Sequence, residues 1–202
     1  EIVVAGADGI VHAYSSNGVK LWSRTLKIYG CPHSSSSNKI FSSPAIGALF
    51  GDGVPYVVIG YGGFGSGGIA CGGGVVAIRG YDGKLRWNFN LKKFAQQHSI
   101  PRFSYAVFST PALADIDNNG RLAVGFGSFS RYSFLLEPNG QVRWYYCNAD
   151  TVWSSPAFAD TDGDGRPEMI IGSDITRNDN LHPPTPNGGY VVALSTKKRS
   201  NK

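Results

Sequence analysis

The sequence predicts an all-β protein built from repeated units of four short antiparallel strands. Two phrases alternate along the 202 residues, and they carry this prediction. The first phrase is an aromatic residue followed by Ser-Ser-Pro-Ala or Ser-Thr-Pro-Ala, with a glycine nine residues after the proline; it begins at Phe41, Phe108 and Trp153. The second is Asn-Gly or Asp-Gly with a tryptophan four residues after the glycine; it ends at Trp22, Trp87 and Trp144. Two phrases in fixed order indicate a repeat array.

Composition agrees with many short strands joined by tight turns. Glycine accounts for 27 of the 202 residues, and aromatic residues make up 12%. The net charge of +5 comes from scattered lysines and arginines. A nucleic-acid surface would need basic and aromatic residues interleaved on one face, so no nucleic-acid partner is expected. No run approaches the ~20 apolar residues of a membrane helix, so no membrane span is expected.

Each repeat unit reads as four strands in a fixed order. The first strand carries Ser-Pro-Ala and ends at an acidic turn, and the second is a short apolar run that ends in glycine, as in residues 168–172. The third has the form of residues 75–78, and the fourth follows the Asp-Gly turn and ends with the tryptophan, as in residues 84–87. Asn-Gly and Asp-Gly between apolar runs are strong hairpin signals. Four antiparallel strands with a periodic aromatic residue are typical of a β-propeller blade.

The units cover about residues 1–28, 40–91, 107–147 and 152–202. They contain three, four, four and three strands, about fourteen in all, with helix nearly absent. Both end units contain second and third strands, so the two cannot complete one another into a single blade. We therefore expect about 3.5 blades of a larger propeller of seven or eight blades, with the remainder on other sequence or on another polypeptide. The three tryptophans are expected to pack between adjacent blades.

Two family resemblances follow from these phrases. The segment Ala13-x-x-x-x-Gly18-x-x-x-Trp22 resembles the repeat of pyrroloquinoline-quinone-type propellers. The segment from Pro156 to Gly165 resembles the FG-GAP, integrin α-type propeller repeat. The resemblance covers nearly the whole chain, apart from insertions at about 61–74, 92–106 and 174–188, and it implies the propeller fold. It implies no particular activity, because propellers carry many unrelated functions.

The strongest chemical motif is the acidic turn that begins at Asp160. Carboxylates at its positions 1, 3 and 5 can converge on one hard cation, glycine at position 6 permits the sharp turn, and a carbonyl at position 7 adds a ligand. The predicted ligands are Asp160, Asp162, Asp164, the carbonyl of Arg166, and Glu168 directly or through water. This all-oxygen set favours Ca²⁺. The alternative is an aspartate-rich turn that holds no ion.

The equivalent turns of the two preceding units are weaker or lost. The middle turn keeps side-chain oxygens but has alanine where Glu168 stands; its candidate ligands are Asp115, Asp117, Asn119 and the carbonyl of Arg121. The first turn has Ala48, Phe50 and Asp52 at the same positions, and no ion is expected there.

The three cysteines show no metal-type spacing. Cys31 and Cys71 both lie in Gly/Ser-rich loop segments around one unit, so we expect them to form a disulfide and Cys147 to be free. Three pairings of a single bridge are possible, and the other two stay open.

The sequence contains none of the catalytic motifs that we searched for. There is no vicinal Cys-Cys pair of the kind used by the related quinone-dependent dehydrogenases, no Gly-x-Ser-x-Gly and no HExxH. The favoured function is therefore a non-enzymatic, Ca²⁺-binding module outside the cytosol, either extracellular, at the cell surface or in another extracytoplasmic compartment. It would bind a protein or carbohydrate ligand or act as a scaffold. The alternatives are part of a polysaccharide lyase-like or quinoprotein-like enzyme with catalytic residues elsewhere, and a structural subunit of a large assembly.

Overall fold

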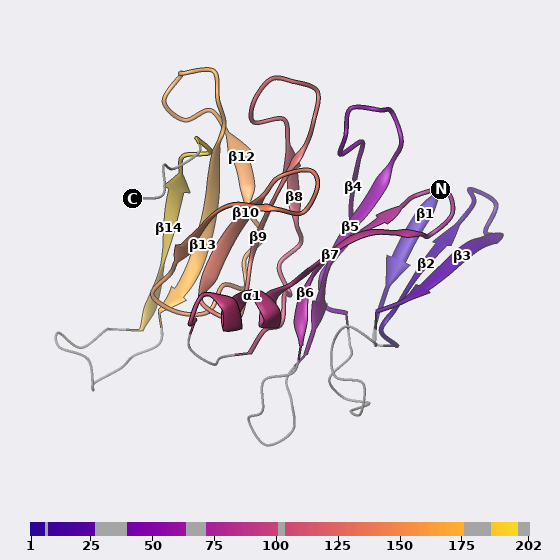
Figure 1. The fold of residues 1–202 in the computed structure, drawn as a ribbon, viewed down its shortest axis with the longest axis horizontal. Helices are drawn as coiled ribbons and strands as arrows, with labels where there is room; N and C mark the ends of the chain where they lie inside the picture. The colour runs from indigo at the N-terminus through magenta and orange to yellow at the C-terminus, as the bar shows by residue number, and fades with distance from the viewer. Residues whose placement is uncertain (7, 27–39, 64–71, 101–103, 176–186, 198–202) are drawn as a thin grey trace.

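In the computed structural model, the chain forms a row of four antiparallel sheets (Figure 1). The structure describes all residues except 7, 27–39, 64–71, 101–103, 176–186 and 198–202. The described part contains fourteen strands, in sheets of three, four, four and three, as predicted. All strand pairs within these sheets are antiparallel.

The two outer sheets have three strands each. The first contains β1 (Ile2–Ala5), β2 (Ile10–Tyr14) and β3 (Lys20–Thr25). The last contains β12 (Ala157–Ala159), β13 (Glu168–Ile175) and β14 (Gly188–Leu194).

The two inner sheets are complete. The second sheet contains β4 (Ala45–Gly47), β5 (Tyr56–Gly62), β6 (Gly73–Arg79) and β7 (Leu85–Asn90). The third contains β8 (Ala112–Ala114), β9 (Ala123–Gly127), β10 (Tyr132–Leu136) and β11 (Val142–Cys147). Strands β5, β6 and β9 are buried almost throughout because each inner sheet is covered on both faces.

One short helix, α1 (Leu91–Gln97), follows β7 inside the predicted insertion 92–106. Asn90 caps its first turn by accepting a hydrogen bond from the backbone N–H of Lys93 at 2.9 Å. Leu91, Phe94 and Ala95 are buried, at the i, i+3, i+4 spacing of an amphipathic helix. The helix therefore packs its apolar face onto the core between the second and third sheets.

Among the described residues, the hydrophobic core forms three layers, one between each pair of neighbouring sheets. The predicted tryptophans belong to these junctions. They pair with equivalent positions of the third strand, each next to a register shift: Trp22 with Ala13, Trp87 with Ala77, and Trp144 with Leu135. Trp22 and Trp144 are buried, and Trp87 is partly buried against the core. The prediction that the tryptophans occupy equivalent, packed positions is confirmed. The prediction that each ends the fourth strand is wrong, because β3, β7 and β11 each continue for three residues beyond the tryptophan.

The tryptophan of one sheet rests on the glycine turn of the next. A Cβ added at Gly83 would lie 2.8 Å from the ring of Trp22, and one added at Gly140 would lie 2.8 Å from the ring of Trp87. The indole N–H of Trp22 donates to the carbonyl of Gly80 at 2.5 Å, and that of Trp87 donates to Pro138 at 2.9 Å. Both parts of the second phrase thus serve the contact between sheets. The indole N–H of Trp144 has no partner among the described residues.

The serine of the first phrase ties strands together inside the sheet and across the junction. The hydroxyl of Ser42 accepts from the backbone N–H of Gly60 at 3.0 Å and donates to the carbonyl of Ser109 in the next sheet at 2.9 Å. The hydroxyl of Ser109 accepts from Gly127 in the same way, at 3.1 Å. Both serines are buried, so a hydroxyl without these partners would be costly.

Two further findings concern the described residues only. None of their helices has the length and apolar character needed to cross a bilayer. Cys147 is an exposed free thiol, while the predicted disulfide between Cys31 and Cys71 lies outside the described residues.

Candidate metal centre

Three equivalent turns, β4–β5, β8–β9 and β12–β13, project from the same edge of the molecule (Figure 1). Each connects the first and second strands of its sheet. The backbone N–H of Leu122 donates to the carbonyl of Leu49 at 3.0 Å, so the first two turns also touch one another. The side chains in these turns decide what each can bind.

In the β12–β13 turn, Asp160 organises the loop from its first position. Its Oδ1 accepts from the backbone N–H of Gly163 at 2.8 Å, and its Oδ2 accepts from that of Gly165 at 2.9 Å. Both glycines have positive φ, 77° and 82°, which lets the chain reverse within six residues. Asp162 in turn accepts from the backbone N–H of Asp164 at 3.1 Å. These bonds hold the first two carboxylates on the inner side of the turn.

Glu168, the first residue of β13, completes a group of three carboxylates. Its side chain is 8% exposed, and its Oε2 accepts from the backbone N–H and the hydroxyl of Thr161 at 3.0 and 2.8 Å. Oxygen atoms of Asp160, Asp162 and Glu168 all lie within 4.8 Å of one another. A buried carboxylate is costly unless a positive charge compensates it, and no described basic side chain pairs with Glu168. The group is therefore suited to an added cation.

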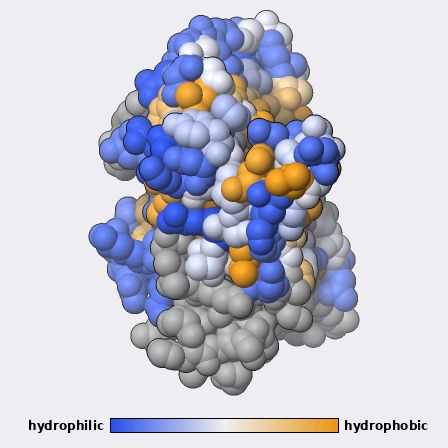
Figure 2. All heavy atoms as spheres, turned by 90° about the vertical axis from the view of Figure 1, so that its right-hand side faces the viewer, coloured by the Kyte–Doolittle hydropathy of each residue, from blue (hydrophilic) through white to orange (hydrophobic). Residues whose placement is uncertain are grey.

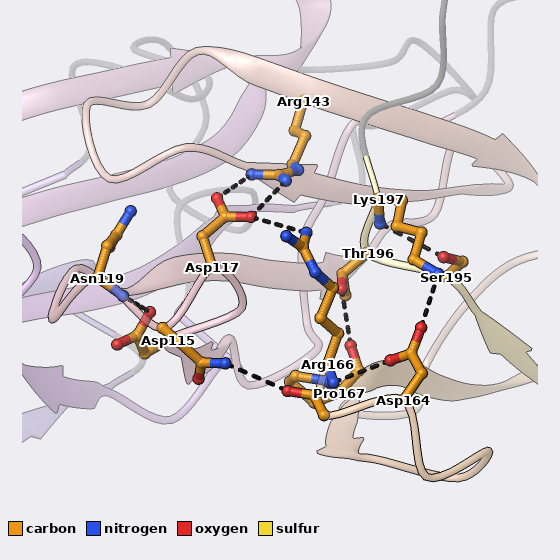
Figure 3. A network of polar contacts seen from close by, with 12 residues as sticks. Asp115, Asp117, Asn119, Arg143, Asp164, Arg166, Pro167, Ser195, Thr196 and Lys197 are labelled. Atoms are coloured by element: carbon orange, nitrogen blue, oxygen red, sulfur yellow. Dashed lines mark hydrogen bonds and ion pairs between the residues drawn. The ribbon is translucent and has the colours of Figure 1, made fainter.

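The structure turns Asp164 away from this group. Its Oδ2 accepts from the ammonium of Lys197 at 2.6 Å, and its Oδ1 accepts from the backbone N–H of Arg166 at 2.9 Å (Figure 3). The Lys197 ammonium holds the pKa of Asp164 below its ordinary value, so the carboxylate stays ionised at neutral pH. Of the predicted ligands, Asp160, Asp162 and Glu168 lie together, while Asp164 is paired with a lysine.

The middle turn has a similar backbone arrangement, but its carboxylate at position 3 is paired with an arginine side chain. Asp115 accepts from the backbone N–H groups of Asn119 and Gly120 at 3.0 and 2.7 Å, and these bonds keep the pKa of Asp115 low. Both oxygen atoms of Asp117 accept from the guanidinium of Arg143, at 2.6 and 2.8 Å. The Arg143 side chain is only 4% exposed, so this bidentate pair is largely shielded from water. The guanidinium of Arg143 thus already pairs with Asp117, the carboxylate at position 3 of the turn that an ion would need as a ligand.

The middle and last turns are bridged to one another. A guanidinium N–H of Arg166 reaches Oδ1 of Asp117 at 3.4 Å, and the side-chain amide of Asn118 donates to the carbonyl of Gly165 at 3.3 Å. Figure 3 shows the resulting chain of contacts, which runs from Arg143 through Asp117 and Arg166 to the last turn. These contacts join the last turn to the third sheet.

Arg143 was missed by sequence reasoning, although a signal for it exists. It directly precedes Trp144 of the second phrase, and the equivalent residue of the second sheet is Arg86. Arg86 lies over the ring of Phe50, 4.7 Å from its centroid, and Phe50 holds the position of Asp117 in its own turn. The residue before the phrase tryptophan therefore reaches position 3 of the turn in both complete sheets. Lys197 carried no comparable signal, because it follows β14 outside both phrases.

The β4–β5 turn keeps the shape of the acidic turns but not their ligands. Asp52 caps the backbone N–H of Val54 at 3.0 Å, and its side chain is exposed. The hydrophobic residues at positions 1 and 3, Ala48 and Phe50, offer no oxygen ligands from their side chains.

No protein-family model matches the sequence, and no curated protein matches it. Solved structures do match its fold. Quinohemoprotein alcohol dehydrogenase ADHIIG from Pseudomonas putida HK5 aligns with a TM-score of 0.63 and 18% identity, over 97% of this chain and 32% of that one. The quinohemoprotein alcohol dehydrogenase of Comamonas testosteroni aligns with a TM-score of 0.59 and 17% identity, over 84% and 30%. This is a β-propeller fold.

A propeller of another description matches equally well. The rhamnogalacturonan lyase YesW aligns with a TM-score of 0.57 and 17% identity, over 93% of this chain and 29% of that chain. The present chain thus spans about a third of the length of these propellers, in agreement with the prediction of a partial propeller. Identities this low show the fold alone, and the different activities of these proteins do not carry over to this chain.

Proposed function

We propose that this chain is a Ca²⁺-stabilised part of a β-propeller that serves as a binding or scaffold module outside the cytosol. The observation that carries the proposal is the convergence of Asp160, Asp162 and the buried Glu168, whose oxygen atoms lie within 4.8 Å of one another. Three carboxylates this close repel one another unless they are neutralised. The middle turn supports the reading by contrast, because there Arg143 supplies the positive charge to Asp117.

The donor chemistry of the group fits Ca²⁺. All three side chains offer hard oxygen ligands, and Ca²⁺ accepts six to eight of these in flexible geometry. The backbone bonds leave capacity free: among the described donors none reaches Oε1 of Glu168 or Oδ2 of Asp162. The Arg166 carbonyl and water would complete the shell, and Asp164 would join it only by releasing Lys197. A site at Asp115, Asp117 and Asn119 would be weaker, because Arg143 already holds Asp117.

The proposed location outside the cytosol rests on the Ca²⁺ affinity that is expected of such a site. Extracellular Ca²⁺ modules commonly bind with a Kd of about 0.1–1 mM. A site of this kind fills outside the cell and stays empty in the cytosol. Binding to the folded chain alone then adds roughly 1 kcal/mol of stability at a few times Kd.

A calcium titration of the melting temperature tests the proposal. Saturating Ca²⁺ should raise the melting temperature of the wild-type chain by roughly 2–4 °C, which corresponds to about 1 kcal/mol for a chain of this size. Asp162→Ala should abolish the rise, because it removes a ligand at the centre of the group. Asp52→Ala, at position 5 of the non-binding turn, is the matched control and should keep the full rise. An equal rise in Asp162→Ala and wild type would show that the acidic turn is only a turn.

A substitution of Lys197 should strengthen Ca²⁺ binding, whereas Asp162→Ala should weaken it. Lys197→Gln removes a positive charge that bonds Asp164 at 2.6 Å and frees that carboxylate for the ion. The ammonium repels a cation bound beside Asp164, so calorimetry should find Ca²⁺ binding tighter once this charge is removed. Lys84→Gln, which removes an exposed lysine beside Asp82 far from this turn, should leave the affinity unchanged. Unchanged or weaker binding in Lys197→Gln would place the ion away from Asp164.

The binding or scaffold role is separable from the calcium site. The expected ligand is a protein or a carbohydrate, and cleavage of acidic polysaccharides by the longer protein would instead favour the enzymatic alternative. A native mass that includes a second kind of chain would favour a subunit of an assembly.

A further inference from the structure

The outward face of the last sheet lacks the cover that the same face has in the other three. Val191 pairs with Gly172 in β14 and β13, just as Val75 pairs with Gly60 in β6 and β5. Val75 is fully buried, whereas Val191 is 71% exposed. The equivalent residues of the first and third sheets, Val11 and Ser133, are fully buried as well. The same holds two residues on: Ala193 is exposed, while Ala13, Ala77 and Leu135 are buried.

The junctions between the second and third sheets and between the third and fourth sheets show what covers this face. A valine of the next sheet, placed directly before the aromatic residue of the first phrase, sits on a glycine of the second strand. A Cβ at Gly60 would lie 2.6 Å from Cγ1 of Val107, and a Cβ at Gly127 would lie 2.2 Å from Cγ1 of Val152. The backbone N–H of the same valine donates to the residue after the glycine, at 3.2 Å for Val107 and 3.1 Å for Val152. A small residue holds this position in every case: in the first sheet it is Ala5, and the backbone N–H of Ile40 donates to the carbonyl of Gly6 at 3.2 Å.

Gly172 is the third glycine of this series, and its seat is open. The nearest atom to a Cβ at Gly172 is Oγ of Ser154 in its own sheet, at 3.3 Å. A hollow of about 480 Å³ lies over it, lined among others by Trp153, Tyr190 and Val191. Gly172 thus keeps the small residue of this position, but among the described residues no valine or isoleucine of a following sheet lies over it.

We propose that this hollow receives a further blade of the same repeat, carried on polypeptide outside residues 1–202. Its first strand would read Val or Ile, aromatic residue, Ser, Ser or Thr, Pro. The valine or isoleucine would fill the space above Gly172, and its N–H would donate to the carbonyl of Ser173. The aromatic residue would extend the row in which Phe41 contacts Phe108 at 4.6 Å and Phe108 contacts Trp153 at 5.7 Å between ring centroids.

A second copy of this chain fits the seat less well. The free sheet at its other end exposes Ile2, Val4 and Leu21, and Figure 2 shows hydrophobic patches among hydrophilic ones on that side. That sheet consists of β1, β2 and β3, however, and has no strand with the first phrase to place on Gly172. A saccharide stacked on Trp153 is the other rival, since Asp174 lies beside it in the hollow. Neither rival explains why the last sheet has small and apolar residues at the positions that the next sheet covers in the second and third sheets. The inference does not depend on the calcium site.

A peptide with the sequence of residues 105–114 of this chain, YAVFSTPALA, is a direct probe of the seat. Added to the isotope-labelled full chain, it should shift the amide signals of Gly172 and Val191 saturably. Gly172→Val fills the seat and should weaken peptide binding at least tenfold. Gly188→Ala is the matched control in β14, because no atom lies within 4 Å of its added Cβ, and it should bind as wild type does. A peptide with glycine in place of Val107 should bind at least tenfold more weakly.

Val191→Glu places a charge on the same face at an exposed position, so it tests the proposal independently of how well Gly172→Val folds. It should also lose the peptide. The proposal is overturned if millimolar peptide gives no saturable shift, or if Gly172→Val and Val191→Glu bind as wild type does. It is equally overturned if oligogalacturonides shift the signals of Gly172 and Val191 and the peptide does not, or if these signals shift only with dimerisation of the chain.

Discussion

Replacing Trp22 by alanine is expected to lower the free energy of unfolding by about 3–5 kcal/mol. The side chain is 9% exposed and packs between the first and second sheets. Its loss would open a cavity over Gly83 and leave the carbonyl of Gly80 without its indole donor. Among the described residues, the core of the first sheet packs against the second sheet, so this junction carries the whole effect of the substitution. Urea unfolding followed by circular dichroism measures the change without relying on tryptophan fluorescence.

Two variants separate packing from general effects of substitution. Leu21→Ala alters the adjacent residue of β3, whose side chain is 45% exposed, and should cost less than about 1 kcal/mol. Trp22→Phe keeps a ring on Gly83 but loses the bond to Gly80, so it should fall between alanine and wild type. If Trp22→Ala and Leu21→Ala were equally stable, the tryptophan would not hold the two sheets together.

Gly140→Ala is expected to destabilise the chain by about 2–5 kcal/mol. Gly140 has φ of +83°, and a Cβ there would lie 2.8 Å from the ring of Trp87. Left-handed backbone costs a residue with a Cβ about 1–2 kcal/mol. Overpacking against the ring adds roughly 1–3 kcal/mol, because the indole is held by its bond to Pro138. Thermal and urea unfolding of the purified variant measure the sum.

Gly18→Ala is the internal control for that sum. Gly18 occupies the same turn position with φ of +82°, yet no atom lies within 4 Å of its added Cβ, because no described tryptophan packs on it. It should show the backbone cost alone, about 1–2 kcal/mol. The difference between the two variants isolates the contact between tryptophan and glycine turn. Equal destabilisation in Gly18→Ala and Gly140→Ala would contradict the role assigned to that contact.

The acidic turns show how far residue patterns reach. The spacing of Asp160, Asp162 and Glu168 was sufficient to predict that they could meet, because all three belong to one short turn and the strand after it. The pairing of Asp117 with Arg143 joins the β8–β9 turn to β11, 26 positions further along the chain. That of Asp164 with Lys197 joins residues 33 positions apart. Such pairs form because the fold places distant parts of the chain side by side, and the spacing of residues within one turn does not predict this.

The local sequence carries a signal for helix α1, although sequence analysis treated this region only as part of an insertion at about 92–106. Asn90 is a good N-cap, and Leu91, Phe94 and Ala95 follow at helical spacing. The signal covers only seven residues, less than an isolated helix needs to be stable in water. Burial of its apolar face against the core between the second and third sheets stabilises it, and that partner is not visible in the local sequence.

Patterns in the local sequence predicted the strands, their order and their grouping. Hairpin turns act between residues close along the chain, so the two repeated phrases made the tally of three, four, four and three strands predictable. Only the tertiary structure showed why the second phrase contains both a tryptophan and a glycine. The ring of Trp22 lies on Gly83, and that of Trp87 lies on Gly140, each in the following sheet. That contact depends on how one twisted sheet packs on the next, and the twist and separation of sheets emerge only when their faces are buried together.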